Sequence, residues 1–251
     1  MQSLGCQGAP YSPDGVLLTA VLPLRDLNPA ARLPIVTVGL IVANFAVWIG
    51  YELQTGLAAS VTELGYHPCE VDGSCPQIGN DWPLTAFTSM FMHGSWSHIV
   101  GNMLFLWIFG NNIEDALGHV RFAAFYLLGG LAATAAQTAV TLGWGSARDG
   151  LIPNVGASGA IAAVLGGYIL LYPRARVMTW VAPFFIFHIP AVAYLGIWFL
   201  FQLWEGSASL TAPEAGGGIA YFAHIGGFVF GFVLIRLFTG RRPRRSQPGY
   251  A

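Results

Sequence analysis

The chain contains no lysine, few charged residues and only three cysteines. Charged residues make up 9% of its 251 residues, whereas a soluble domain usually carries about 25%. Hydrophobic residues make up 55%, and the mean hydropathy is +0.58. This composition excludes an ordinary soluble domain and indicates that lipid is the main solvent. Because each membrane span needs roughly 20 residues, the length suits about six spans and leaves no room for a second folded domain.

Six apolar stretches are long enough to be membrane-spanning helices. They cover residues 34–53, 90–110, 122–143, 156–172, 178–204 and 218–239. The fifth is the longest, and Pro183 and Pro190 inside it predict a kinked helix. We therefore expect an all-α membrane protein with a six-transmembrane-helix bundle. The expected parts are a non-spanning leader at 1–33, a membrane domain at 34–239 and a basic tail at 240–251.

Arginine alone decides the expected topology, because the chain has no lysine. Six spans place both termini on one face of the membrane. That face receives ten of the arginines, at positions 25, 32, 121, 174, 176, 236, 241, 242, 244 and 245. The other face receives only Arg148. The positive-inside rule therefore predicts that both termini are cytoplasmic. The tail 241–245 is interpreted as an anchor beside anionic lipid, and we expect no binding of nucleic acid.

The three cysteines divide between the two faces. Cys6 lies in the leader and is expected to be a free thiol. Cys69 and Cys75 lie together in the first outer loop, where an oxidising compartment permits a disulfide. A bridge and two free thiols remain equally open, and a bridge would have a structural role.

Two polar side chains suggest chemistry within the membrane. Ser158 lies in the run Gly156–Ala160 at the start of the fourth span, and His224 lies near the start of the sixth. In the predicted topology both spans begin at the outer face, so the two residues share a depth. Polar groups at membrane depth are costly and carry a functional hypothesis. Acyl transfer to water needs a nucleophile, a base and donors for an oxyanion, and Ser158 and His224 supply the first two.

Small residues on both spans favour contact between this serine and this histidine. Gly227 and Gly231 follow the histidine on one helical face, and Ala162 and Gly166 follow the serine on another. Small faces let helix backbones approach closely. The alternative is that serine and histidine only pack and hydrogen-bond structurally. Packing alone, however, does not require these two residue types at the same level.

The remaining polar residues of the spans define the rest of the expected site. None of the twelve acids lies beside the pair, so we predict a Ser–His dyad without an orienting carboxylate. An aspartyl protease lacks its paired acids here, and a zinc protease lacks its HExxH motif. His98 and Asn102 share one face of the second span and are predicted oxyanion donors. His93 is assigned to loop structure, and we expect no metal and no cofactor.

The chain resembles the rhomboid intramembrane serine proteases over residues 34–239. The motifs that carry this resemblance occur in the same order on the second, fourth and sixth spans. They are His98-Ile99-Val100-Gly101-Asn102, Gly156-Ala157-Ser158-Gly159 and Ala223-His224-Ile225-Gly226-Gly227 with Gly231, and the segment Glu114–Gly118 with Arg121-Phe122 also matches. Each motif alone is weak, but three in this order are specific.

The resemblance implies that Ser158 is the nucleophile, His224 the general base, and His98 and Asn102 the oxyanion donors. It implies a water-filled cavity, no cofactor and transmembrane, often single-pass, protein substrates. The fifth span and the loop 205–218 would form a lateral gate or cap, although that loop is equally well a flexible connector. Glu114 would tie the bundle together at the cytoplasmic end of the second span.

Two positions depart from the family pattern. Some bacterial members stack an aromatic residue on the base, and that position here is Ala162, so an aromatic residue from elsewhere is expected to hold His224. Trp82 is followed by Pro83 rather than by arginine, so the outer loop is expected to be anchored differently.

Two other functions compete with proteolysis. A rhomboid-like pseudoprotease would bind membrane proteins without cleavage, but it usually loses the serine or the histidine. A transporter or channel would need a continuous polar path, whereas the polar residues here cluster in the outer half of the bundle. The short ends favour a prokaryotic plasma membrane, with the active site on the external side.

Overall fold

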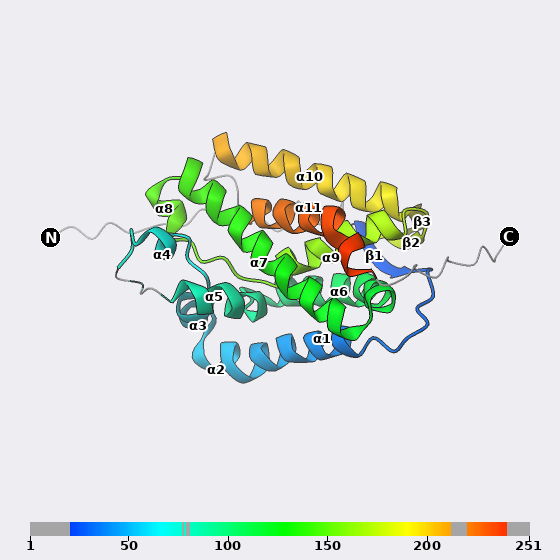
Figure 1. Cartoon of the computed structure of the whole chain (residues 1–251), viewed down its shortest axis with the longest axis horizontal. Helices are drawn as coiled ribbons and strands as arrows, with labels where there is room; N and C mark the ends of the chain where they lie inside the picture. Colours follow the sequence, from blue (N-terminus) through cyan, green and yellow to red (C-terminus); the bar gives the residue numbers. More distant parts are fainter. Residues whose placement is uncertain (1–20, 77, 79–80, 212–219, 240–251) are drawn as a thin grey trace.

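The computed structural model describes residues 21–76, 78, 81–211 and 220–239. Within them the chain forms a bundle of long helices (Figure 1). The long elements are α1 (Ile35–Val47) with its continuation η2 (Trp48–Glu52) and α2 (Leu53–Thr55), α6 (Trp96–Leu117), α7 (His119–Trp144), α9 (Ser158–Leu171), α10 (Ala191–Thr211) and α11 (Tyr221–Phe238). Short elements between them are α3 (Leu57–Leu64), α4 (Cys69–Asp72), α5 (Trp82–Thr88), η3 (Ser89–Phe91) and α8 (Ala147–Gly150).

Helix α9 forms the centre of the bundle. Every residue from Gly159 to Tyr168 is buried, and the helix contacts α6, α7, α10 and α11. A helix that is apolar on all sides is expected to be enclosed by its neighbours. Because the motif serine begins this helix, the most enclosed element of the fold positions the candidate nucleophile.

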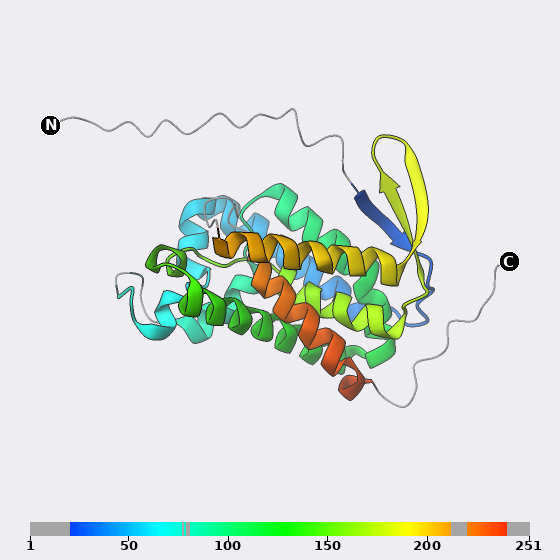
Figure 2. The same ribbon diagram turned by 90° about the horizontal axis from the view of Figure 1, so that it is seen from above.

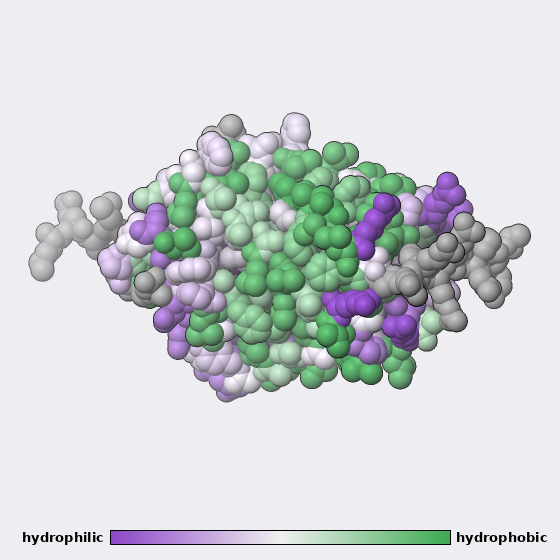
Figure 3. All heavy atoms as spheres, viewed as in Figure 1, coloured by the Kyte–Doolittle hydropathy of each residue, from purple (hydrophilic) through white to green (hydrophobic). Residues whose placement is uncertain are grey.

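Among the described residues, three helices are long and apolar enough to cross a membrane: the continuous segment Ile35–Thr55, α7 and α11. Helix α9 is apolar but shorter. One face of the molecule carries apolar residues across its middle and hydrophilic residues toward its two ends (Figure 3). This banding is the pattern that a bilayer selects. The chain is therefore a mostly helical membrane protein, while the count of six spans stays a prediction.

The predicted fifth span is wrong in its first half. Residues Arg176–Val181 and Phe185–Pro190 form strands β2 and β3, which pair as an antiparallel hairpin, and helix begins only at Ala191. Aromatic and β-branched residues, which favour strands, dominate the hairpin. Pro183 lies in its turn, after a cis peptide bond, and Pro190 ends β3. Proline is costly inside a helix, so these positions mark boundaries rather than kinks.

A third strand comes from the predicted leader. Strand β1 (Val21–Asp26) pairs with β2, with Val21 opposite Val181, and completes an antiparallel sheet of order β1-β2-β3. The expectation of an all-α fold is corrected to this extent, and the folded unit begins before residue 34. Sequence periodicity missed β1 because its partner lies beyond α9 in the chain.

Polar contacts attach β1 to the helices. The carboxylate of Asp26 accepts hydrogen bonds from the Tyr168 hydroxyl of α9, at 2.7 Å, and from the Asn112 amide of α6. The Asn28 amide also donates to Asn112, at 2.6 Å. The segment before α1 is therefore an integral part of this end of the bundle.

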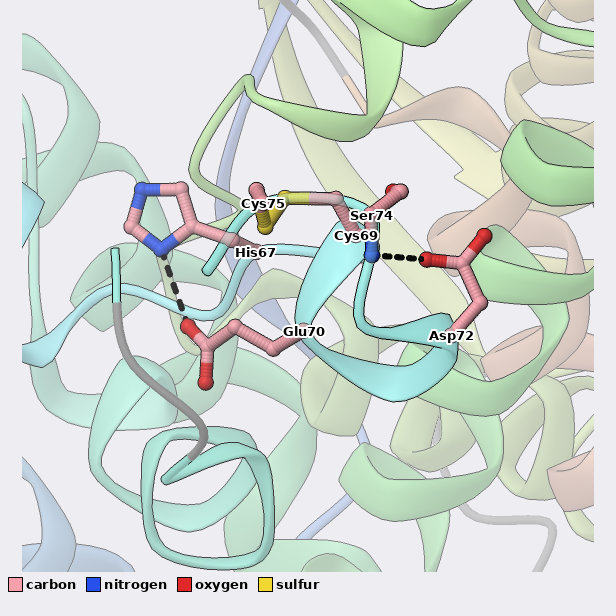
Figure 4. Close-up of a disulfide and its surroundings, with 6 residues drawn as sticks. All are labelled: His67, Cys69, Glu70, Asp72, Ser74 and Cys75. Carbon is pink, nitrogen blue, oxygen red and sulfur yellow. Dashed lines mark hydrogen bonds and ion pairs between the residues drawn. A yellow bond between two sulfur atoms is a disulfide. The ribbon is translucent and has the colours of Figure 1, made fainter. Parts of the chain in front are cut away.

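The loop between α2 and α6 is anchored without the Trp-Arg pair of some family members. Cys69 and Cys75 form a disulfide, which settles the open choice in favour of a bridge. Beside it, the His67 imidazole lies 3.2 Å from the buried carboxylate of Glu70 (Figure 4). Tyr66 pairs with the backbone of Asn154 ahead of α9, so the loop is tied to the segment that leads to Ser158.

Several predicted features lie wholly or partly outside the described residues. These are Cys6, the basic tail 241–245 and half of the loop 205–218, of which residues 212–218 are not described. Residues 205–211 were predicted to be loop, but they are helical, because α10 continues to Thr211.

Candidate active site

Ser158 is placed by a turn that only glycine forms easily. Gly156 has φ +118°, outside the range that side chains favour, and its N–H donates to the carbonyl of Ser89 at 2.8 Å. The chain then enters α9, and Ser158 is its first residue. The first N–H groups of a helix have no intrahelical partners, so this position suits a developing negative charge.

Backbone-to-backbone contact brings α11 against α9. A Cβ on Gly227 would clash with the carbonyl oxygen of Gly159, and one on Gly231 would clash with that of Ala163. Likewise, a Cβ on Gly166 would clash with the Phe228 carbonyl. The small faces predicted from the sequence therefore do meet, and this approach decides how near the serine and the histidine lie.

The structure brings Ser158 and His224 together. The Nε2 atom of His224 lies 2.8 Å from the Ser158 hydroxyl oxygen, within hydrogen-bond distance. Both side chains are half-buried, so the pair is neither sealed in the core nor lying freely on the surface. A hydroxyl beside an imidazole nitrogen is the arrangement in which a base activates a serine nucleophile.

His98 and Asn102 approach the same point from α6. A Cβ on Gly156 would lie 2.6 Å from His98 Nε2 and 3.4 Å from Asn102 Nδ2, so both side chains face the turn before Ser158. Asn102 is 8% exposed, and its Nδ2 donor is buried without a hydrogen-bond partner in the described structure. A buried unpaired donor is costly, which is consistent with a group kept for a ligand.

His93 has a different position, in the loop before α6. It is fully buried, and its backbone N–H donates to the Glu52 carboxylate at 2.7 Å. Its ring packs edge-on against that of His98. Burial lowers the pKa of His93 to about 3, so its ring is neutral at physiological pH. Among the described residues, no three His, Cys, Asp or Glu side chains are arranged to hold a metal ion.

Two residues of α10 complete the surroundings of His224. The Trp198 ring lies 5.9 Å from the imidazole at an interplanar angle of 38°, and Gln202 Oε1 lies 2.8 Å from its Nδ1. Sequence reasoning expected an aromatic group from elsewhere but did not name Trp198, and it missed Gln202 by searching for carboxylates. A glutamine within an apolar helix was the available signal, because polar groups at membrane depth rarely lie there without a role.

A second polar cluster lies at the opposite end of α6. The buried carboxylate of Glu114 accepts hydrogen bonds from the backbone N–H groups of Val36 and Thr37, both at 2.8 Å. It also accepts from the Thr37 hydroxyl and contacts the His119 ring. These contacts join α1, α6 and α7, as the resemblance implied for Glu114.

A pocket of about 380 Å³ lies near the site but does not contain the pair. Residues of α7, α8, α10 and α11 line it, among them Gln137, Trp144, Asp149 and Phe222. The Gln137 amide oxygen accepts the N–H of Ala223, next to His224, at 3.2 Å. The pocket therefore lies against the part of α11 that carries the histidine.

The fold and the site together define a helical membrane protein with a serine–histidine pair at one end of its central helix. The Rhomboid domain model matches residues 81–241, which include all of α6 to α11. This match covers more than half of the chain, and the chain belongs to the rhomboid family.

Several named proteins are similar to this chain. "Rhomboid protein 1, mitochondrial" of Saccharomyces cerevisiae is 31% identical over 63% of this chain and 44% of its own length. "RHOMBOID-like protein 12, mitochondrial" of Arabidopsis thaliana is 35% identical over 57% and 43%, respectively. "Presenilin-associated rhomboid-like protein, mitochondrial" of Homo sapiens is 31% identical over 57% and 35%. The chain thus spans less than half of the length of these relatives.

These relatives correct one prediction. All three are mitochondrial by name, so the expectation of a prokaryotic plasma membrane is contradicted. The error arose because short ends and a simple span layout describe a size, and size does not identify a compartment.

Proposed function

We propose that this protein is an intramembrane serine endopeptidase that cleaves transmembrane protein substrates, often single-pass, near the membrane surface. One observation carries the proposal: His224 Nε2 lies 2.8 Å from the Ser158 hydroxyl oxygen, although the two residues come from different helices. Family membership supports the same activity. No cofactor is needed for this chemistry.

The proposed reaction uses each site residue in one role. His224 Nε2 takes the hydroxyl proton as Ser158 attacks the scissile carbonyl, and His98, Asn102 and the first N–H groups of α9 stabilise the oxyanion. The intermediate collapses as His224 returns the proton to the leaving amine, which departs and leaves an acyl-enzyme. Water then attacks the ester, with His224 again as base, and releases the second product and free Ser158.

The sheet supports a bundle with an even number of spans between β1 and β2. Paired strands lie on one side of a membrane, and α1, α6, α7 and α9 are the long helices between these two strands. Four crossings satisfy this condition, and α10 and α11 then make six. Arg25 and Arg176 lie in the sheet and Arg148 lies in α8, which fits both termini on the arginine-rich face. The proposed parts are a membrane domain at 34–239 with β1 attached, the rest of 1–33 as a leader, and a tail at 240–251. The relatives' names favour a mitochondrial membrane.

The test is cleavage of a panel of single-pass substrates by purified protein in liposomes. Ser158→Ala and His224→Ala should each abolish cleavage, and Ser158→Ala should also abolish labelling by a fluorophosphonate probe. The matched controls are Ser207→Ala and His188→Ala, because both of these residues are exposed and lie outside the proposed site. Full cleavage by Ser158→Ala protein would contradict the assignment.

The competing function is binding without cleavage. If the wild-type protein neither cleaves any substrate nor reacts with the probe, while it still retains single-pass proteins in a pull-down, the pseudoprotease reading replaces the protease. The intact Ser158–His224 contact favours the protease, because a pure binder has no use for this hydrogen bond.

A further inference from the structure

The two ring nitrogens of His224 face different helices. Nε2 faces Ser158 of α9, and Nδ1 lies 2.8 Å from Gln202 Oε1 of α10. An amide oxygen only accepts hydrogen bonds, so this contact requires a proton on Nδ1. The neutral ring then has no proton on Nε2, and Nε2 is free to accept the serine proton. The opposite tautomer would present an N–H to the hydroxyl and would be unable to act as a base.

Gln202 is buried, and a second residue of its helix also contacts the imidazole. Its side chain is 7% exposed, and Trp198, one helical turn earlier, covers the imidazole from the same face of α10. A buried amide keeps a single orientation more readily than a mobile surface side chain. Helix α10 therefore offers the imidazole one hydrogen-bond acceptor and one aromatic wall.

The register of α10 against α11 depends on contacts on either side of Gln202. Phe199 stacks on Phe228, which lies one turn after the histidine in α11, with ring centroids 4.3 Å apart. One turn above, a Cβ on Gly206 would lie 3.4 Å from the Cβ of Tyr221. A shift of α10 by one turn would break the stacked pair and move Gln202 away from His224. The position of α10 is thus coupled to the state of the base.

We infer that Gln202 is a positioning residue that holds His224 in the tautomer able to accept the Ser158 proton, so that α10 must be docked for the pair to work. The inference rests on the proposed peptidase function. It assigns to an amide the place that a carboxylate takes in a Ser–His–Asp triad.

The first experiment needs no substrate. Histidine is labelled with ¹⁵N in the full-length protein, and the tautomer of His224 is read by NMR, with His224→Gln protein used to assign its signal among the six histidines. The expected neutral form carries its proton on Nδ1. A proton on Nε2 in the wild-type protein would overturn the inference even if the protein is an active protease.

The second experiment compares pH profiles of cleavage. Gln202→Met should lower kcat about tenfold with KM unchanged, and should move the acid limb of the profile to lower pH, because the imidazolium loses its acceptor. Gln202→Glu should move that limb upward by about one pH unit, because a carboxylate stabilises the cation. The matched control is Gln137→Met, which removes the acceptor of a hydrogen bond from the Ala223 N–H of α11 and leaves the imidazole contacts in place. Its acid limb should stay in place.

Three outcomes separate this inference from the proposed function. Wild-type protein that neither cleaves nor reacts with a fluorophosphonate would end the proposed function and, with it, the inference. Active wild-type protein with unshifted acid limbs in both Gln202 variants would end the inference alone. Recovery of kcat by Gln202→Glu relative to Gln202→Met would support it, because a purely structural role gives no reason for such recovery.

The β2–β3 hairpin carries a second, independent inference. It extends sideways from the bundle beyond the start of α10 (Figure 2). The side chains around its turn are strongly exposed. Phe184 is 85% exposed, Phe185 60%, Ile186 55% and Phe187 49%. A run of exposed apolar residues of this kind marks an interaction site. The base of the hairpin differs, because Val177 and Thr179 are fully buried there.

Charge at the base of the hairpin indicates the partner. Arg174 and Arg176 are exposed where the chain leaves α9 and enters β2, at the boundary of the apolar bundle. Phenyl rings beside arginines fit the interface of an anionic bilayer, where rings enter the acyl region and guanidinium groups contact phosphates. We propose that residues 184–187 lie in the lipid interface and brace the start of α10.

An environment-sensitive fluorophore on the full chain tests this placement. An NBD label on Phe184→Cys, in a Cys6→Ser background and in phosphatidylglycerol-containing vesicles, should emit as in an apolar medium and be quenched by nitroxide lipids. A label on Arg148→Cys, in α8 at the opposite end, should emit as in water. Water-like emission from position 184 would overturn the proposal. So would apolar emission that disappears when the protein is diluted in lipid, which would indicate a second copy as the partner.

Discussion

Helices α9 and α10 both contact the site, yet the protein surrounds them very differently. Helix α9 is buried without interruption from Gly159 to Tyr168. Helix α10 is exposed along most of its length, with Ile197 68%, Leu200 64% and Trp204 71% exposed. Helix α9 carries the serine itself. Helix α10 carries no member of the Ser–His pair, and contributes to the site through side chains that contact the histidine. The nucleophile is therefore the first residue of the most buried helix, and the groups that contact the base lie on a helix with a largely exposed face.

This difference teaches that the two contacts to His224 have unequal structural supports. The Ser158 contact follows from glycine faces where backbones touch, so it persists as long as the bundle is folded. The Gln202 contact follows from side chains alone, such as the Phe199–Phe228 stack. The first turns of α10 belong to the core, where Ala191, Tyr194 and Leu195 are buried. Displacing only the later turns, around Gln202, would therefore disturb less core packing and would still release the imidazole.

The largest expected effect comes from closing the gap between α9 and α11. Gly231→Ala places a methyl group against the Ala163 carbonyl, where no side-chain rotation relieves the clash. We expect a loss of about 3 kcal/mol of unfolding free energy and a separation of the Ser–His pair. The control is Gly196→Ala on α10, which meets nothing within 4 Å and should stabilise its helix by up to about 1 kcal/mol. Denaturation in detergent measures both, and equal stabilities would refute the contrast.

A smaller effect is expected on the α10 side, and it concerns activity rather than stability. Trp198→Leu removes the ring beside His224, and we expect cleavage to fall about tenfold while the unfolding midpoint changes little. Trp204→Leu, on the same helix but facing outward, should leave both unchanged. A comparable drop in thermal stability for Trp198→Leu would mean that α10 supports the core as α9 does.

The smallest effect concerns pH and the end of α9 far from the site. Burial raises the pKa of Asp26 to about 6, so its protonated form favours the folded state. This contribution is fully present below the unfolded pKa near 4 and is lost as the pH rises through 6. Asp26→Asn should remove this dependence. Unfolding midpoints between pH 4 and 8 measure it, and parallel curves for the two proteins would exclude it.

The local sequence was enough to predict apolar helices and the packing of helix faces that carry small residues. The stretches at 122–143 and 156–172 became α7 and α9 nearly as drawn, because apolar length and composition determine such helices. The contact between Ser158 and His224 could be predicted because the spacing of Gly227 and Gly231 is visible in the sequence of one helix.

The features that sequence reasoning missed depend on partners far along the chain. Residues 178–190 lie in an apolar stretch of span length, but residues 178–181 pair with β1 on one side and with residues 185–188 of β3 on the other. Gln202 contacts His224 only when α10 packs against α11, and this packing cannot be inferred from the sequence of either helix alone. Pro183 and Pro190 were the local signal for this difference, because two prolines within one predicted span argue against a continuous helix.

The pairing of β1 with β2 also carries a consequence for the order of events during synthesis. The ribosome makes β1 before any of the long helices, but its partner emerges only after α9 is complete. Until then the first strand must wait on the side of the membrane where β2 will appear, with its backbone groups unpaired. In the proposed topology, closing the sheet is therefore a late step of biogenesis, because it requires the intervening helices to have crossed the bilayer first.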